Sequence, residues 1–424
     1  MGVEDMAATL AQALTPAMVD SEQINEEFRP LVYLVKELIG VIPNCNPYLG
    51  IWPPAFRILN VLVPNLLNLP ASLVGQGAPK ELVGLAMYAS SRESGCMYCT
   101  AHHCSFAIRR GAAIESVVDG NYTPAEAAIV DVAEAVARVP VDLAPAHLNE
   151  LEKHLSPAAI EWVILAVAMG GFLNKFMDTM GIELEYETIA DIEPLIGDQG
   201  WSPGKHQWLD ELPEIASDGI PTDNFRTLMR VVRRAPGAIK FDAAFTKGVS
   251  GRLGPALLML EDRTGYSFPI LASLTHKRAV KAIATALRDS LDAETTQVGL
   301  AAKCMVALVY AKIVEDEVLT SEAVQLADGL APDLDPVTMM EIGRFARCPA
   351  ESATMPSGLS QVEAASVMLA KAGSTSPSSI NEFTVEAITE QLTPAQIVEV
   401  VAWLGVLQML HRLYAFYDAR IGLL

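Results

Sequence analysis

The sequence predicts an all-α protein, and two observations carry that prediction. Few segments alternate apolar and polar residues with the period of two that strands show, whereas apolar residues recur at helical spacing along most of the chain. Helix starts are also visible: Thr123-Pro124-Ala125-Glu126 sets a threonine cap before proline and glutamate, and Ser156-Pro157 opens a long apolar segment. We therefore expect a protein built from packed helices.

The first half of the chain predicts a series of helices separated by breakers. Residues 1–50 predict helices that end in a proline- and asparagine-rich turn at 43–47. A helix follows over about 54–74, and the glycine-rich stretch 75–79 ends it. The next helix, over 80–91, leads into a cysteine-rich helix that we expect to end at Gly111.

Length and composition indicate two domains. At 424 residues the chain is long for one compact core. Between residues 191 and 223 proline and glycine become frequent and are mixed with acidic side chains, as is typical of an interdomain connection. We expect a helical domain over residues 1–195, a linker over 196–224 and a second helical domain over 225–424.

Four short stretches of the first half recur in the same order in the second, which argues for a duplication. The pairs are 82–86 with 297–301, 122–126 with 358–363, 155–158 with 392–395, and 173–176 with 410–413. There is no cysteine between Cys304 and Cys348 and no histidine between His276 and His411. The second half therefore cannot repeat the cysteine motif of the first half, and we expect it to be a structural partner.

The charge of the chain limits its partners. Acidic side chains number 51 against 30 basic ones, which gives a formal net charge of −21 at pH 7. Such an excess repels phosphate backbones and anionic lipids, so we expect neither nucleic acid nor a membrane as a partner. The apolar share of 51% on so acidic a chain suggests large buried contacts, so we expect a homo-oligomer.

The sequence also predicts a cytoplasmic location. Acidic Glu4 and Asp5 stand where a secretory signal would be basic, and Pro64, Glu161 and Lys175 interrupt the longest apolar stretches. Six cysteines are too few for a disulfide scaffold. In the cytosol a Cys-x-x-Cys pair more often serves redox or metal chemistry than structure.

Reactive side chains are concentrated between Ser94 and Cys104. Cys96 and Cys99 are three residues apart, and His103 follows one helical turn later. Steps of about 100° per residue place these three side chains within roughly 60° of one another on a helix. We expect the helix to start at Ser94 or Gly95, with both cysteines in the first turns, where unpaired backbone N–H groups favour a thiolate. The pattern predicts a dithiol with a histidine placed to move its proton.

These residues resemble a known family. Lys80-Glu81-Leu82-Val83, followed by Gly95-Cys96-Met97-Tyr98-Cys99 and His103, is similar to the carboxymuconolactone decarboxylase-like superfamily, and more narrowly to its alkylhydroperoxidase D-like branch. The helix start at Leu155 and the Asn174-Lys175 pair are similar to that family's later helices. The resemblance implies two tandem alkylhydroperoxidase D-like helical domains, the second degenerate, in a protein that assembles into trimers or hexamers.

For the site, the resemblance implies a thiol peroxidase or disulfide reductase without metal, haem or other cofactor. Carried over residue by residue, Cys99 is the peroxidatic thiol, Cys96 the resolving thiol, and His103 with Glu81 the proton relay. Strict family spacing would require the acid at Gly84, so Glu93 is the alternative to Glu81. The expected partners are a hydroperoxide or other small-molecule substrate and a thiol/disulfide electron-donor protein.

Other interpretations of the same residues stay open. The cysteines could be inert core residues, because free cysteine is commonly buried, or could join Cys104 and a histidine around zinc. The same scaffold could carry lactone decarboxylation, which does not need two thiols, or could be a non-catalytic binding or assembly protein. We expect Cys104 to be packing and His102 to lie at a surface or interface, and we assign no role to the other histidines (His147, His154, His206, His276 and His411).

Overall fold

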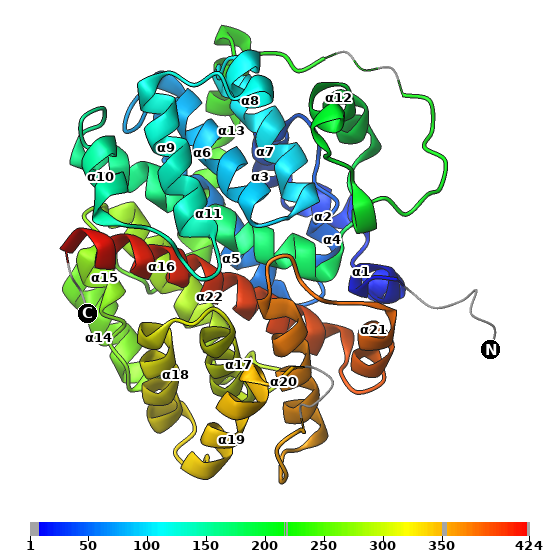
Figure 1. Cartoon of the computed structure of the whole chain (residues 1–424), viewed down its shortest axis with the longest axis vertical. Helices are drawn as coiled ribbons and strands as arrows, with labels where there is room; N and C mark the ends of the chain where they lie inside the picture. Colours follow the sequence, from blue (N-terminus) through cyan, green and yellow to red (C-terminus); the bar gives the residue numbers. More distant parts are fainter. Residues whose placement is uncertain (1–7, 216, 218, 350–353, 422–424) are drawn as a thin grey trace.

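The structure is a computed structural model that describes residues 8–215, 217, 219–349 and 354–421. All regular structure in these residues is helical, without any strand, which confirms the predicted all-α class (Figure 1). The helices of the first half are α1 (Leu10–Leu14), α2 (Ser21–Glu27), α3 (Arg29–Ile39), α4 (Asn46–Leu49), α5 (Pro53–Leu66), α6 (Lys80–Glu93), α7 (Met97–Arg110), α8 (Ile114–Asp119), α9 (Pro124–Ala137), α10 (Pro145–Leu151), α11 (Pro157–Met180) and α12 (Tyr186–Ile196).

The second half continues with ten further helices among the described residues. They are α13 (Phe225–Phe245), α14 (Leu253–Thr264), α15 (Ile270–Ser273), α16 (Lys277–Ser290), α17 (Leu300–Ile313), α18 (Glu317–Leu330), α19 (Pro336–Arg347), α20 (Gln361–Ser374), α21 (Glu382–Thr389) and α22 (Pro394–Ile421). Short 3₁₀ helices cover Thr15–Ala17, Ala71–Val74, Gly197–Gln199 and Gly204–His206.

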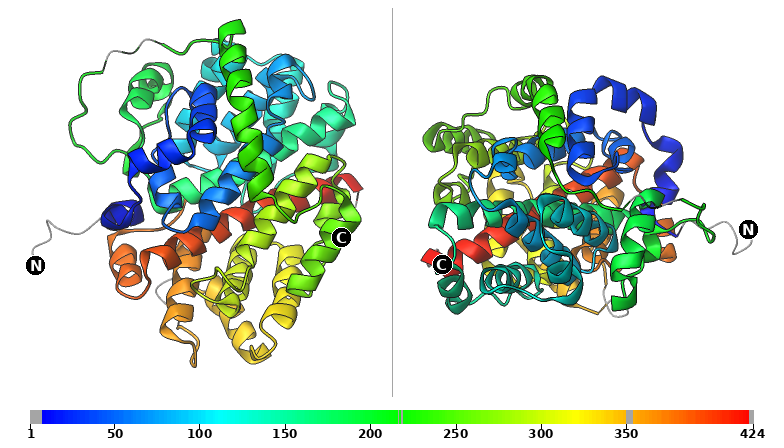
Figure 2. Two further views of the ribbon diagram at one scale, coloured as in Figure 1. Left: turned by 180° about the vertical axis from the view of Figure 1, so that it is seen from behind. Right: turned by 90° about the horizontal axis from the view of Figure 1, so that it is seen from above.

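The two halves meet along α11 and α22, the longest helices. These helices pack side by side across the middle of the molecule, with most of the first half on one side and most of the second half on the other (Figures 1 and 2). One continuous cluster of buried apolar side chains draws members from both halves. The halves are therefore joined through a common core rather than connected as two separate bodies.

The predicted helix starts are confirmed in detail. Thr123 caps α9 and exchanges hydrogen bonds with Glu126. Ser360, which we did not predict as a cap, does the same for α20 with Glu363. Ser156 accepts the N–H of Ala159 at the start of α11. These caps satisfy backbone donors that have no partner inside the helix, which is why the sequence signals are local and readable.

The order of the helices from α5 to α11 resembles the order from α16 to α22. The members α5, α6, α7 and α9 each have 14 residues, as do α16, α17, α18 and α20. The echoed stretches 82–86 and 297–301 lie differently in their helices: 82–86 is inside α6, which begins at Lys80, whereas α17 begins only at Leu300. The duplication itself stays a prediction.

Two segments do not follow the predicted division of the chain into a first domain, a linker and a second domain. Trp201 and His206, in the expected linker, are buried, and the Trp201 indole N–H donates to the Met97 carbonyl at the start of α7. α13, the first helix of the expected second domain, packs against α3 of the first half (Figure 2, left view). Part of the linker and part of the second domain thus belong to the first half's packing.

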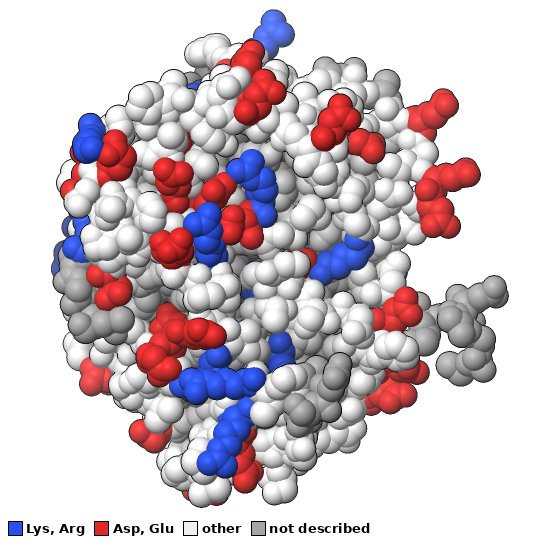
Figure 3. Space-filling view, viewed as in Figure 1, with Lys and Arg blue, Asp and Glu red and all other residues white. Residues whose placement is uncertain are grey.

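Three helical segments are long and apolar enough to cross a membrane by length and composition: Pro53–Val74, Pro157–Met180 and Pro394–Arg420. The interruptions noted in the sequence do not remove them from this class, contrary to our expectation. In the fold, 56%, 78% and 100% of their most apolar windows are buried inside the protein, so packing with other helices uses this surface. On the face drawn in Figure 3, acidic side chains are scattered among basic ones.

Candidate dithiol site

The two cysteines lie at the start of α7. The predicted cap at Ser94 or Gly95 is wrong: α6 ends at Glu93, Gly95 turns the chain with φ +68°, and Cys96 itself is the cap of α7. The Cys96 sulfur accepts the N–H of Cys99 at 3.3 Å. A thiol thus holds the capping position and its partner lies in the first turn, which keeps the two side chains together.

Cys99 and His103 line a small cavity among α3, α5, α6, α7 and α11. The cavity has a volume of about 80 Å³, and its lining is mainly apolar, with Val35, Leu59, Met87, Phe106, Met169 and Leu173 among its members. Cys96 is fully buried behind Cys99 and does not line the cavity, and Cys99 is 2% exposed. An apolar molecule in this cavity therefore meets the Cys99 sulfur first.

His103 belongs to a chain of hydrogen bonds inside the protein. Its Nδ1 lies 2.6 Å from the Ser91 hydroxyl, and the Asn174 amide N–H donates to that hydroxyl at 2.8 Å. Ser91 lies in the last turn of α6 and Asn174 in α11, so three helices fix the imidazole. Sequence reasoning identified His103 but missed Ser91, whose side chain gave no signal of its own.

The structure does not bring either candidate glutamate to His103. Glu81 lies in the first turn of α6, ten residues before Ser91, which corresponds to about 15 Å along the helix axis. Glu93 is directed to the surface, where it forms an ion pair with Arg138 at 3.1 Å. The neutral Ser91 is the side chain that holds the ring nitrogen.

A carboxylate does enter the site region, from a distant part of the sequence. Glu185, just before α12, accepts hydrogen bonds from the Tyr98 hydroxyl at 2.9 Å and from the Asn44 backbone N–H at 2.5 Å. Its second oxygen lies 2.7 Å from His102 Nε2. The expectation that His102 lies at a surface or interface is wrong, because Glu185 and Tyr98 enclose it and leave it 5% exposed.

Burial decides the protonation of the resting site. It raises the pKa of the Cys99 thiol well above the ordinary value, an effect that Cys96 strengthens and Asn174 opposes. It lowers the pKa of His103 to about 3, with His102 as the second cause. The site at neutral pH thus pairs a neutral Cys99 thiol with a neutral His103 imidazole.

The expected thiolate is therefore not the resting form of Cys99. A helix start stabilises a negative charge by about 0.3–1 kcal/mol, and by up to about 2 kcal/mol when partly buried. Full burial shifts a pKa by up to about 3–5 units, at about 1.4 kcal/mol per unit. Desolvation is the larger effect here, and it depends on tertiary burial, which a short motif does not reveal.

The remaining cysteines are consistent with packing. Burial raises the pKa of Cys104 to about 12, and no other cause contributes. All six cysteines are free thiols. Within the described residues, no three histidine, cysteine, aspartate or glutamate side chains are grouped so that they could hold a metal ion.

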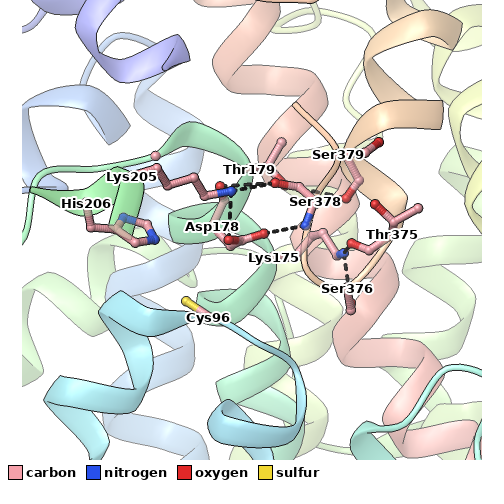
Figure 4. Close-up of polar contacts among 12 residues, drawn as sticks. Cys96, Lys175, Asp178, Thr179, Lys205, His206, Thr375, Ser376, Ser378 and Ser379 are labelled. Carbon is pink, nitrogen blue, oxygen red and sulfur yellow. Dashed lines mark hydrogen bonds and ion pairs between the residues drawn. The ribbon is translucent and has the colours of Figure 1, made fainter. Parts of the chain in front are cut away.

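Residues of the second half line the other side of the cysteine turn. Lys175 of α11 donates to the carbonyls of Ser374 at 3.2 Å and Thr375 at 2.7 Å, and to the Ser376 hydroxyl (Figure 4). Nearby, Asp178 pairs with Lys205 at 2.8 Å and accepts the Ser378 N–H at 2.6 Å. A loop that follows α20 is thus attached to the helix that carries Asn174.

Comparisons with known proteins add little to this picture. No protein-family model matches the chain, and no curated protein sequence matches it. One solved structure with similarity is the crystal structure of the debrominase Bmp8 without ligand, at 23% sequence identity and a TM-score of 0.35. The match covers 40% of this chain and 90% of that one.

Proposed function

We propose that the protein is a thiol-dependent reductase of small organic hydroperoxides. The observation that carries the proposal is the arrangement around Cys99: Cys99 and His103 line the same apolar cavity, and the Cys96 sulfur accepts the backbone N–H of Cys99. An alkyl hydroperoxide combines an apolar body with one reactive polar end, so its chemistry suits this lining. The resemblance of the Cys96–His103 segment to alkylhydroperoxidase D-like proteins supports the same reading.

The proposed reaction has two steps, followed by reduction of the disulfide. The Cys99 sulfur attacks the outer oxygen of R–O–O–H, the O–O bond breaks, and the products are Cys99 sulfenic acid and the alcohol R–OH. The Cys96 thiol then attacks the sulfenic sulfur, which forms the Cys96–Cys99 disulfide and releases water. A dithiol reductant returns both thiols by exchange and is itself oxidised to a disulfide.

His103 serves proton transfer in the first step. Because the Cys99 thiol is neutral at rest, its proton must leave as the sulfur attacks, and the leaving alkoxide must gain one. A neutral imidazole can accept the first proton and return it to the alkoxide. Ser91 and Asn174 keep the ring in one orientation during both transfers.

The wider proposal follows the resemblance. We place the protein in the cytoplasm, where free thiols persist, and expect it to form an oligomer that light scattering would measure directly. We also propose that the chain is a tandem of two alkylhydroperoxidase D-like units.

The deciding experiment is mass spectrometry of the reduced protein after one equivalent of cumene hydroperoxide. The expected result is a loss of two hydrogens that maps to the peptide containing Cys96 and Cys99, with one equivalent of cumyl alcohol. The Cys99→Ser variant is the matched control and should leave the hydroperoxide unreduced. Unchanged thiols in the wild-type protein would overturn the proposal.

One observation favours a rival function, a non-catalytic helical protein with inert cysteines. Both sulfurs are buried, and the Cys99 pKa is raised, as is usual for structural cysteine. The same experiment separates the two, because inert cysteines leave the hydroperoxide and the protein mass unchanged.

A further inference from the structure

The side chain of Arg412 reaches the dithiol site from the second half of the chain. It projects from α22 and is 1% exposed. Its guanidinium donates to the Ser94 hydroxyl at 2.7 Å, two residues before Cys96, and to the Asn174 side-chain oxygen at 3.1 Å. A third hydrogen bond goes to the Val167 carbonyl at 2.7 Å.

The route of this side chain across α11 depends on glycine. A Cβ atom at Gly171 would lie 3.0 Å from Arg412 Cδ and 3.1 Å from its Nε, which is closer than ordinary contact. A Cβ atom at Gly170 would lie 3.7 Å from Arg412 Nη1 and 3.8 Å from His103 Cε1. Gly171 thus leaves room for the Arg412 side chain, and the ordinary contact distances at Gly170 show that the guanidinium and the His103 ring both lie next to that residue.

Through Asn174, Arg412 controls how His103 is held. The guanidinium can only donate, so it fixes the oxygen of the Asn174 amide toward itself and turns the amide N–H₂ to Ser91. Ser91 in turn holds His103 Nδ1. Arg412 is therefore the far end of a hydrogen-bond chain that ends at the imidazole.

The charge of Arg412 lacks a carboxylate partner among the described residues. All three of its acceptors are neutral oxygens. Removing a cation from water without a paired anion costs several kcal/mol. Arg110, another buried arginine, instead pairs with the Asp223 carboxylate. An unpaired buried cation beside two thiols can stabilise a thiolate that forms only during the reaction.

The other groups around the sulfurs do not supply a permanent positive charge. They are Tyr98, His102 and His103 of α7, Lys175 and Asp178 of α11, and Cys45 before α4. Burial lowers the pKa of Lys175 to about 7, so its charge is partly lost at neutral pH. Burial lowers the pKa of Arg412 only to about 10, and both thiols interact with its charge.

We propose that Arg412 is a positioning residue of the dithiol site, supplied by the second half, which stabilises the Cys99 thiolate and orients His103 through Asn174 and Ser91. The second half is then part of the reacting unit and not only its structural partner. The proposal rests on the proposed function for its catalytic meaning, but its effect on thiol reactivity can be measured without any peroxide.

The test measures the pH dependence of Cys99 alkylation by iodoacetamide in the full-length protein, with the modified residue identified by mass spectrometry. Arg412→Met keeps the apolar length of the side chain and removes the charge. An opposite charge nearby lowers a pKa by about 1–3 units, so the variant should react about tenfold more slowly or worse at a fixed pH below the thiol pKa. Arg412→Lys, which restores the charge, should recover most of the thiol reactivity.

Arg110→Met is the matched control, because it removes a buried arginine from α7 that does not reach the cysteines. A slowed Arg412→Met variant beside an unchanged Arg110→Met variant supports the proposal. Equal alkylation profiles of folded wild-type and Arg412→Met protein would overturn it. If Arg412→Met does not fold, Arg412→Gln, which keeps a hydrogen-bond donor and removes the charge, takes its place, and an unchanged alkylation profile in that variant would overturn the proposal equally. A failure of peroxide reduction by the wild-type protein would refute the proposed function and leave this alkylation result standing.

Discussion

The Ser91 hydroxyl and His103 Nδ1 lie 2.6 Å apart inside the protein, where the family resemblance implies a glutamate. A hydroxyl can hold the ring in place but cannot stabilise an imidazolium as a carboxylate does. Burial without an acid at Nδ1 keeps the pKa of His103 low, at about 3. The site is therefore arranged to start from neutral groups.

We predict that Ser91, and not Glu81, supports the reaction. Ser91→Ala removes the hydrogen bond to His103 and should slow single-turnover reduction of cumene hydroperoxide by about tenfold or more, since positioned acid–base groups contribute about 10²–10⁴-fold. Glu81→Gln should change the rate less than twofold, because Glu81 lies at the other end of α6. Stopped-flow kinetics on both variants checks this, and the reverse order of effects would restore Glu81 to the relay.

Cys96→Ser should stop the reaction at the sulfenic acid. Without the resolving thiol, Cys99 sulfenic acid should persist and react with dimedone, adding one label per chain. Cys104→Ser, which removes a buried cysteine of the same helix, should still form the disulfide. Labelling followed by mass spectrometry of the peptide distinguishes the two, and labelled Cys96 in a Cys99→Ser variant would exchange the two roles.

The rate of thiol alkylation should rise with pH and should not level off at the ordinary thiol pKa. The thiolate is the reactive form, and burial raises the pKa of Cys99. The thiolate fraction therefore increases about tenfold per pH unit until the pH passes that raised pKa. Iodoacetamide kinetics from pH 6 to pH 10 measure the profile. A plateau below pH 7 would mean that the helix start outweighs desolvation.

Glu185 should be important for stability. Glu185→Ala leaves two buried donors, on Tyr98 and His102, and a half-buried one, on Asn44, without their acceptor. Each unsatisfied group costs about 1–3 kcal/mol, so the free energy of unfolding should fall by about 3 kcal/mol or more. Glu187→Ala removes an exposed acid of α12 and should change it by less than about 0.5 kcal/mol. Urea denaturation compares the two, and similar losses would contradict the structure.

The parts of the fold that the sequence predicts correctly depend on local physics. The capping pair of Thr123 and Glu126 involves residues three apart, so a helix start can be recognised without knowing what packs on it. The common face predicted for Cys96, Cys99 and His103 assumed that Cys96 lies inside the helix, whereas Cys96 is the extended cap residue before α7.

The parts that the sequence misses depend on contacts between distant residues. Glu185 meets His102 across 83 positions, and Arg412 meets Asn174 across 238. Neither residue carries a local pattern that marks it. We expected a Cys99 thiolate, and the resting form is the neutral thiol. This error has the same origin, because the burial of Cys99 depends on helices that are distant in the sequence.

Cys96 and Cys99 are almost completely enclosed, which limits the reductants that can reach the disulfide of the proposed reductase. A folded redox protein presents its own thiol on a broad, rigid surface. Such a surface cannot contact sulfur atoms that are covered by helices. A slender dithiol, narrow enough to enter where the hydroperoxide enters, meets no such obstacle. For the proposed reductase, we therefore predict turnover with small dithiols rather than with the electron-donor protein that the resemblance implies.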